Sequence, residues 1–195
     1  MSLDQAIANE VTLKVAWEDL TPGPVGEYVE VIDYDPESDC FYVPVDLNAP
    51  PVLVQGGLPP AQGVPQFHQQ MVYAVVMSTI RHFERGLGRT VLWAPRFEGL
   101  RDGSTREGFV QRLRVYPHAL RGEQTYYSPE KRALLMGCFP METTSAAGKR
   151  VRTTSFACLS PATVAHETAH AILHGLQCSV GLHPRWTPTS DAQCH

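Results

Sequence analysis

Two histidines and a glutamate near the C-terminal end of the sequence have the types and spacing of a hydrolytic metal site. His166, Glu167 and His170 form the pattern His-Glu-x-x-His. On a helix, residues four apart lie one turn apart on the same face, so both imidazoles can point a ring nitrogen at one ion. Zinc accepts imidazole ligands at about 2 Å. Glu167 could then act as a general base toward a water that zinc activates, the chemistry used to cleave amide bonds.

The residues around this pattern predict a helix. Ser160 and Pro161 provide an N-cap and a first-turn proline. Gly175 is expected to end the helix. The alternative is a buried helix whose histidines only satisfy hydrogen bonds, but the motif in this setting favours zinc. Apolar residues recur at helical spacing on a face beside the histidines: Val164, Ala165, Ala169, Ile172, Leu173 and Leu176.

Composition limits the classes to which the chain can belong. Its 195 residues, 43% hydrophobic with a net charge of -4, suffice for one ordinary core, with room for two lobes. The arginines are dispersed among acids and apolar residues, which argues against a nucleic-acid partner. No apolar stretch reaches the length of a membrane span, and the N-terminus lacks the features of a signal peptide. We therefore expect a soluble, cytoplasmic chain without membrane association.

The cysteines do not indicate a disulfide framework or a cysteine-based zinc site. They are five in number, scattered, and without any C-x-x-C spacing. Most are expected to be buried small apolar residues. Cys194 and His195 form a terminal pair that could bind a metal adventitiously.

The hydrophobic pattern predicts an α+β fold with a mixed or antiparallel sheet, a long central helix and the motif helix. The long helix is expected at residues 66–85, where apolar side chains cover more than one face. We expect residues 48–65, 97–108 and 141–152 to be irregular. Strands are expected at residues 11–17, 28–34, 40–45, 90–94, 109–116, 133–139 and 153–159.

Four stretches resemble the N-terminal lobe of thermolysin-like gluzincins and, more closely, uncharacterised bacterial zinc metallopeptidases of that clan. The resemblance spans residues 28–177, and only its last stretch is a chemical motif. It implies that His166 and His170 bind zinc, that Glu167 is the catalytic base, and that the substrate is a peptide or protein. The four stretches are residues 65–73, 91–96, 126–131 and 164–171.

The resemblance also implies a strand that binds the substrate. Gln124, Thr125, Tyr126 and Tyr127 would match an edge strand that pairs with an extended peptide through main-chain hydrogen bonds. The alternative for the two tyrosines is packing in the core and at its rim.

After the motif helix the chain departs from the gluzincin pattern. The family's third zinc ligand is a glutamate on a following helix, but no glutamate follows Glu167, and Asp191 is the one later acid. The second lobe, which by resemblance brings the groups that stabilise the oxyanion, is also missing. We interpret residues 1–177 as a gluzincin-like lobe and 178–195 as a tail unlike the family. Truncation or a frameshift could explain the tail, and the abrupt change after Gln177 favours a frameshift.

Other histidines are candidates for the missing ligand. His174 lies eight residues after His166, about 12 Å along a helix, too far for one ion, so we expect it to orient His170 or face solvent. His183 and His195 lie in the tail and could reach back to the motif. The histidines expected to be structural are His68, His82 and His118.

Two functional interpretations follow from these patterns. The first is a zinc-dependent metallopeptidase lobe that, without the third ligand, is inactive or weakly active as it stands. The second is a non-catalytic peptide-binding or interaction module of the same fold. In either case, apolar surface exposed by the absent lobe predicts oligomerisation.

Overall fold

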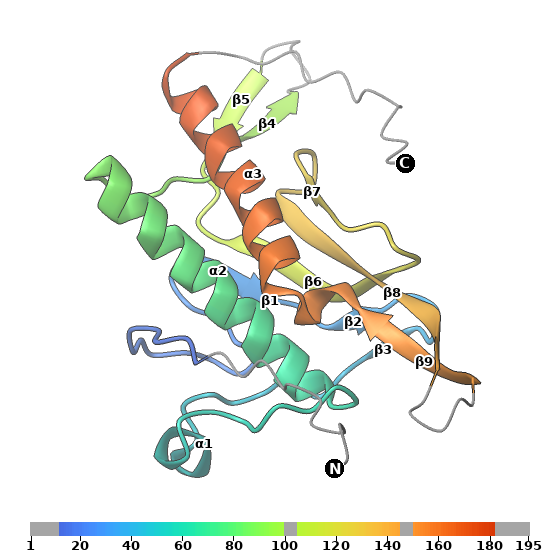
Figure 1. The fold of residues 1–195 in the computed structure, drawn as a ribbon. Helices are drawn as coiled ribbons and strands as arrows, with labels where there is room; N and C mark the ends of the chain where they lie inside the picture. Colours follow the sequence, from blue (N-terminus) through green and yellow to red (C-terminus); the bar gives the residue numbers. More distant parts are fainter. Residues whose placement is uncertain (1–11, 100–104, 145–149, 182–195) are drawn as a thin grey trace.

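The structure, a computed structural model, describes residues 12–99, 105–144 and 150–181. It is an α+β fold in which two long helices cover a mixed sheet (Figure 1). The sheet contains β1 (Val29–Val31), β6 (Leu113–Arg121), β7 (Tyr126–Ser128), β8 (Ala133–Thr144) and β9 (Arg150–Phe156). The helices are α1 (Pro50–Val54), α2 (Pro65–Leu87) and α3 (Pro161–Ser179), with a 3₁₀ turn, η1 (Ala157–Leu159), just before α3. The predicted fold class is confirmed at this level.

The order of the main sheet is β1-β6-β8-β7, and β9 also pairs with β8. The pairings of β1 with β6 and of β6 with β8 are parallel, whereas β7 and β9 run antiparallel to β8. Two smaller antiparallel pairs lie outside this sheet. They are β2 (Tyr34–Asp35) with β3 (Cys40–Phe41), and β4 (Arg96–Gly99) with β5 (Thr105–Gly108).

The long helix α2 lies close to its predicted position. Pro65 occupies its first turn, where the missing N–H costs no helical hydrogen bond. Gly88 ends it in the left-handed conformation (φ 65°), and its N–H donates to the carbonyl oxygen of Glu84 at 2.8 Å. The prediction at residues 66–85 is therefore confirmed, with the helix slightly longer at both ends.

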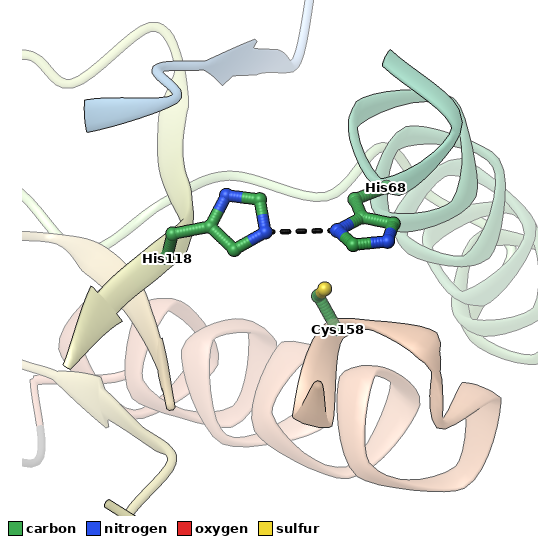
Figure 2. Close-up of side chains that lie close together, drawn as sticks. All are labelled: His68, His118 and Cys158. Carbon is green, nitrogen blue, oxygen red and sulfur yellow. Dashed lines mark hydrogen bonds between the residues drawn. The ribbon is translucent and has the colours of Figure 1, made fainter. Parts of the chain in front are cut away.

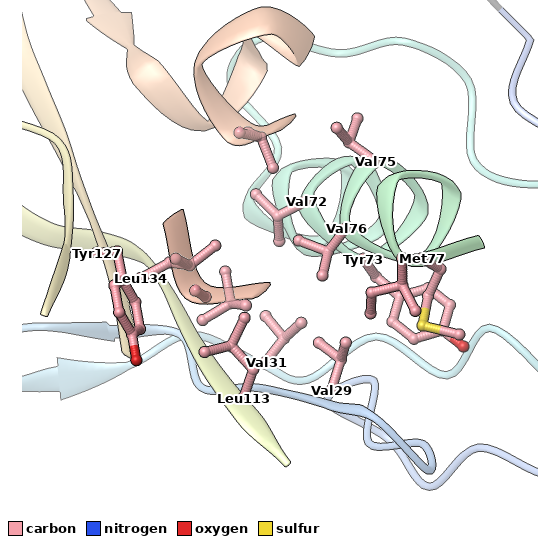
Figure 3. Close-up of a cluster of buried hydrophobic side chains, with 14 of the residues drawn as sticks. Val29, Val31, Val72, Tyr73, Val75, Val76, Met77, Leu113, Tyr127 and Leu134 are labelled. Atoms are coloured by element: carbon pink, nitrogen blue, oxygen red, sulfur yellow. The ribbon is translucent and has the colours of Figure 1, made fainter. Parts of the chain in front are cut away.

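The hydrophobic core lies between the helices α2 and α3 and the main sheet (Figure 3). Val72 and Val76 of α2 are fully buried, as are Val29 of β1 and Leu113 of β6. Burying such side chains contributes about 1.5–3 kcal/mol each, so this layer fixes how α2 lies across the sheet. Other members include Val31, Val75, Ile80, Val115, Leu134, Val164, Ala171 and Ile172.

The motif helix begins as predicted but does not end at Gly175. The Ser160 hydroxyl accepts a hydrogen bond from the Thr163 N–H at 3.3 Å, and α3 then continues to Ser179. The stop prediction was wrong because Gly175 serves packing: a Cβ there would lie 2.0 Å from the Leu92 carbonyl oxygen. The absent side chain lets α3 pack closely against the backbone at residue 92.

Several predicted strands differ from the structure. Residues 12–17 form no strand, and Val11 lies outside the described residues. Residues 90–94 are irregular, whereas the expected loop at 97–108 contains most of the β4–β5 pair. The other two stretches expected to be irregular also contain regular elements, α1 within 48–65 and the facing ends of β8 and β9 within 141–152. The expected strand at 109–116 begins later, at Leu113, because β6 pairs in parallel with β1 from that residue onward.

Apolar side chains are also present on the surface of the described chain. Trp17 is 71% exposed and Phe109 is 79% exposed. Scattered exposed apolar groups are common on monomers, so oligomerisation stays a prediction. None of the described helices combines the length and the apolar character that crossing a membrane requires.

Candidate metal centres

The structure brings His166 and His170 together on an exposed face of α3. Their Nε2 atoms lie 3.0 Å apart and their ring planes are nearly perpendicular. Both side chains are exposed, because the apolar face of α3 is turned toward α2 and the sheet. Two facing imidazole nitrogens at this separation can share a proton or accept one cation between them.

Glu167 is tied to the neighbouring edge strand. One of its carboxylate oxygens accepts a hydrogen bond of 2.8 Å from the backbone N–H of Tyr127 in β7. The side chain is half-buried, unlike the histidines on either side of it in the motif. This bond fixes the carboxylate against β7 and joins α3 to the edge of the sheet.

The four residues predicted to bind substrate have different environments. Tyr126 is 43% exposed, whereas Tyr127 is buried against α3. Gln124 is exposed and Thr125 half-buried, and both precede β7, which begins at Tyr126. The Thr125 hydroxyl accepts a hydrogen bond from the Gly137 N–H at 3.1 Å. Of the four, Tyr127 is the residue that contacts the motif helix directly.

His174 pairs with Tyr127. Its Nδ1 lies 3.0 Å from the Tyr127 hydroxyl, in place of the expected contact with His170 or with solvent. Burial raises the pKa of Tyr127 to about 12. Burial and then the nearby Arg132 charge lower the pKa of His174, so the ring is neutral at neutral pH. This pair reinforces the junction between α3 and β7.

No third metal-binding side chain joins the α3 pair within the described parts of the chain. In these ranges, the three side chains that lie close enough together to hold a metal ion belong to a different cluster. The tail candidates His183, Asp191, Cys194 and His195 lie outside the described residues. Within the described residues, α3 therefore presents two facing histidines with no third ligand beside them.

That different cluster is buried and contains His68, His118 and Cys158 (Figure 2). His68 lies near the start of α2, His118 in β6 and Cys158 in η1. Their ligand atoms all lie within 4.8 Å of one another, and Nδ1 of His68 is 2.8 Å from Nε2 of His118. No spacing in the sequence predicts this group, because its members are far apart in the chain.

Hydrogen bonds orient both rings of the buried cluster from behind. Nε2 of His68 lies 2.8 Å from the Gln62 carbonyl oxygen, and Nδ1 of His118 lies 2.5 Å from Asp33. Asp33 in turn accepts a hydrogen bond of 2.8 Å from the Gln69 side chain. The structural role expected for His68 and His118 agrees with their burial, but their arrangement offers more than packing. His82, in contrast, is exposed.

Comparisons with known proteins leave these observations to stand alone. No protein-family model, no curated protein and no solved structure matches the chain.

Proposed function

We propose that the chain is the zinc-binding lobe of a thermolysin-like metallopeptidase that acts on peptides. The observation that supports this most is the placement of three side chains on and beside α3. The Nε2 atoms of His166 and His170 face one another at 3.0 Å, and the carboxylate of Glu167, which follows His166 in the motif, is held by the Tyr127 N–H of β7.

The imidazoles of His166 and His170 provide two of the ligands that a zinc site needs. Neutral imidazole is a preferred zinc ligand, and the two exposed rings can separate slightly to accept an ion. The described residues supply these two donors, and a stable site requires at least one more, from the tail or from a partner chain. Zinc, when bound, would supply Lewis-acid polarisation of the scissile carbonyl and an activated water.

Glu167 is the residue to which we assign general-base chemistry. A base must be ionised, close to the attacking water and held in one orientation. The Tyr127 N–H satisfies one carboxylate oxygen, and the second oxygen can take up a proton. Because the anchor is a main-chain group of β7, the base keeps a fixed position relative to that strand.

The edge position of β7 supports an extended peptide as the substrate class. β7 pairs with β8 along one side only, and its other side faces α3. A peptide added along this edge would lie beside Glu167. Side chains of the peptide would then meet the exposed Tyr126 ring.

A non-catalytic peptide-binding module is the second candidate. It is favoured because the described residues supply two zinc ligands, His166 and His170, whereas a catalytic zinc site has three protein ligands. Such a module would keep the edge strand and bind peptides without hydrolysing them.

Hydrolysis of an unstructured protein by the zinc-loaded chain separates the two candidates. We expect slow, zinc-dependent cleavage, detected as new N-termini by mass spectrometry. Glu167→Gln is expected to lower the rate about 100-fold or more while the zinc content stays the same. Binding of the peptide without cleavage, with zinc present, would contradict the peptidase proposal and support the module.

A further inference from the structure

We propose that His68, His118 and Cys158 form a second metal site, specific for a divalent transition metal such as zinc, buried between α2, β6 and η1 (Figure 2). The site shares no residue with the α3 pair, so it is independent of the proposed peptidase function. A metal ion bound there would be shielded from solvent, because all three side chains are at most 3% exposed.

The hydrogen-bond partners of His68 and His118 determine which ring nitrogens carry protons. The Gln62 carbonyl can only accept a hydrogen bond, so Nε2 of His68 must carry a proton. The Asp33 carboxylate likewise requires a proton on Nδ1 of His118. With neutral rings, both inner nitrogens then present lone pairs to each other at 2.8 Å. A cation must lie between them, either one extra proton or a metal ion.

The arrangement behind the rings also resembles that of metal-binding histidines. Histidines that bind metals usually donate their outer N–H to a carboxylate or a backbone carbonyl, which fixes the tautomer and the ring orientation. His118 has the carboxylate and His68 has the carbonyl. Asp33 is held in turn by Gln69, whose amide oxygen accepts the Val45 N–H at 2.8 Å. The α3 histidines have no such hydrogen bonds to their outer nitrogens within the described residues.

A divalent metal ion would balance the charges of this buried group. A buried charge is costly unless it is neutralised locally. Asp33 and a Cys158 thiolate together carry two negative charges, which a divalent ion balances. Without metal, a neutral thiol and one proton between the two inner nitrogens would give the same balance. Metal binding would therefore release two protons, one from sulfur and one from the histidine pair.

The distances require only small adjustments. Tetrahedral zinc with nitrogen and sulfur ligands needs ligand atoms about 3.3–3.7 Å apart. The inner nitrogens must therefore move apart by about 0.5 Å, and the sulfur must approach them by at most about 1.2 Å. A Cys–His–Asp nucleophile is disfavoured because Cys158 is fully buried and cannot reach a substrate.

The test uses the full chain with His166→Gln and His170→Gln, which removes the α3 pair. The protein is prepared metal-free and titrated with cobalt(II), and then with zinc. We expect one cobalt per chain with a near-ultraviolet thiolate-to-cobalt charge-transfer band, and release of two protons per zinc. Adding Cys158→Ser should abolish the band and weaken zinc binding by tenfold or more. Cys138→Ser, which changes another buried cysteine, should leave both unchanged.

Two results would overturn the proposal. One is a folded double-histidine variant that binds no cobalt or zinc. The other is bound cobalt without a thiolate band, or with a band that Cys138→Ser removes. The cobalt spectrum of the His166→Gln/His170→Gln protein decides the outcome by itself. The test therefore still works if Cys158→Ser does not fold. Failure of peptide hydrolysis would not affect this result, since Glu167 takes no part in the site.

Discussion

The backbone N–H of Tyr127 donates a 2.8 Å hydrogen bond to the Glu167 carboxylate. This contact joins a residue of the edge strand to the glutamate of the His-Glu-x-x-His motif. It makes the position of Glu167 depend on β7, and it makes the docking of α3 depend on Glu167.

Substitutions of Glu167 should separate these two roles. Glu167→Gln keeps an oxygen that can accept the Tyr127 N–H, so we expect little change in the free energy of unfolding. Glu167→Ala leaves that N–H without its acceptor and should lower the free energy of unfolding by about 1–2 kcal/mol. Urea unfolding of the three proteins measures the difference. Equal stability of the alanine and glutamine variants would show that the bond does not contribute.

Gly175 should be intolerant of any side chain. A methyl group there would meet the Leu92 carbonyl oxygen at 2.0 Å, so Gly175→Ala is expected to destabilise the protein by about 1–3 kcal/mol or more. Gly86 is the matched control, because it lies in α2 with open space around its Cβ position. Gly86→Ala should stabilise the protein by about 0.5–1 kcal/mol. Thermal unfolding of both variants tests this difference. A shift of both unfolding midpoints in the same direction would contradict the packing argument.

The N-cap of α3 should contribute measurably to stability. Ser160→Ala removes the acceptor of the Thr163 N–H and should cost about 1 kcal/mol. Ser160→Asp keeps a capping oxygen and places a negative charge at the positive end of the helix dipole, so its stability should equal or exceed that of the wild type. Chemical denaturation of both variants tests the cap. A destabilised aspartate variant would contradict this account.

Stability should fall on mild acidification because of His174. Its pKa is lowered by burial and by Arg132, whereas in the unfolded chain it titrates near 6.5. The folded state therefore binds fewer protons between these two pKa values, so the stabilisation is complete above 6.5 and is lost as pH falls toward the folded pKa. Tyr127, Arg132 and Cys178 are the ionisable groups that interact in this region.

Unfolding measured at about pH 7 and about pH 5.5 checks this prediction. The wild type should lose more stability between the two conditions than His174→Gln does, because the variant lacks the titrating ring. Other histidines contribute equally to both proteins. The same loss in both would show that His174 does not titrate as its burial requires.

Local sequence signals predicted the two long helices well, but they missed α1 and predicted the sheet less well. The apolar spacing and first-turn prolines of α2 and α3 are local features, so their positions could be predicted. Gly175 is a typical stop signal, but its close packing against residue 92 depends on a contact far away in the sequence. The pairing of β1 with β6 also joins distant segments, so its direction could not be predicted from local patterns.

The candidate sites show the same division. His166 and His170 could be recognised because a fixed spacing on one helix brings their nitrogens together. His68, His118 and Cys158 come from a helix, a strand and a 3₁₀ turn, and only the folded core brings them together. The available signal was two histidines within apolar segments, which indicates burial but identifies no partner.

The central claim is that the α3 histidines bind zinc, and the most direct measurement is the zinc content of Cys158→Ser. This variant weakens the buried site, so zinc retained after dialysis against a weak chelator reports on His166 and His170. The account predicts retained zinc that is lost when His166→Gln and His170→Gln are added. A folded Cys158→Ser protein that retains no zinc, or whose zinc content does not fall when these two histidines are replaced, would contradict the claim.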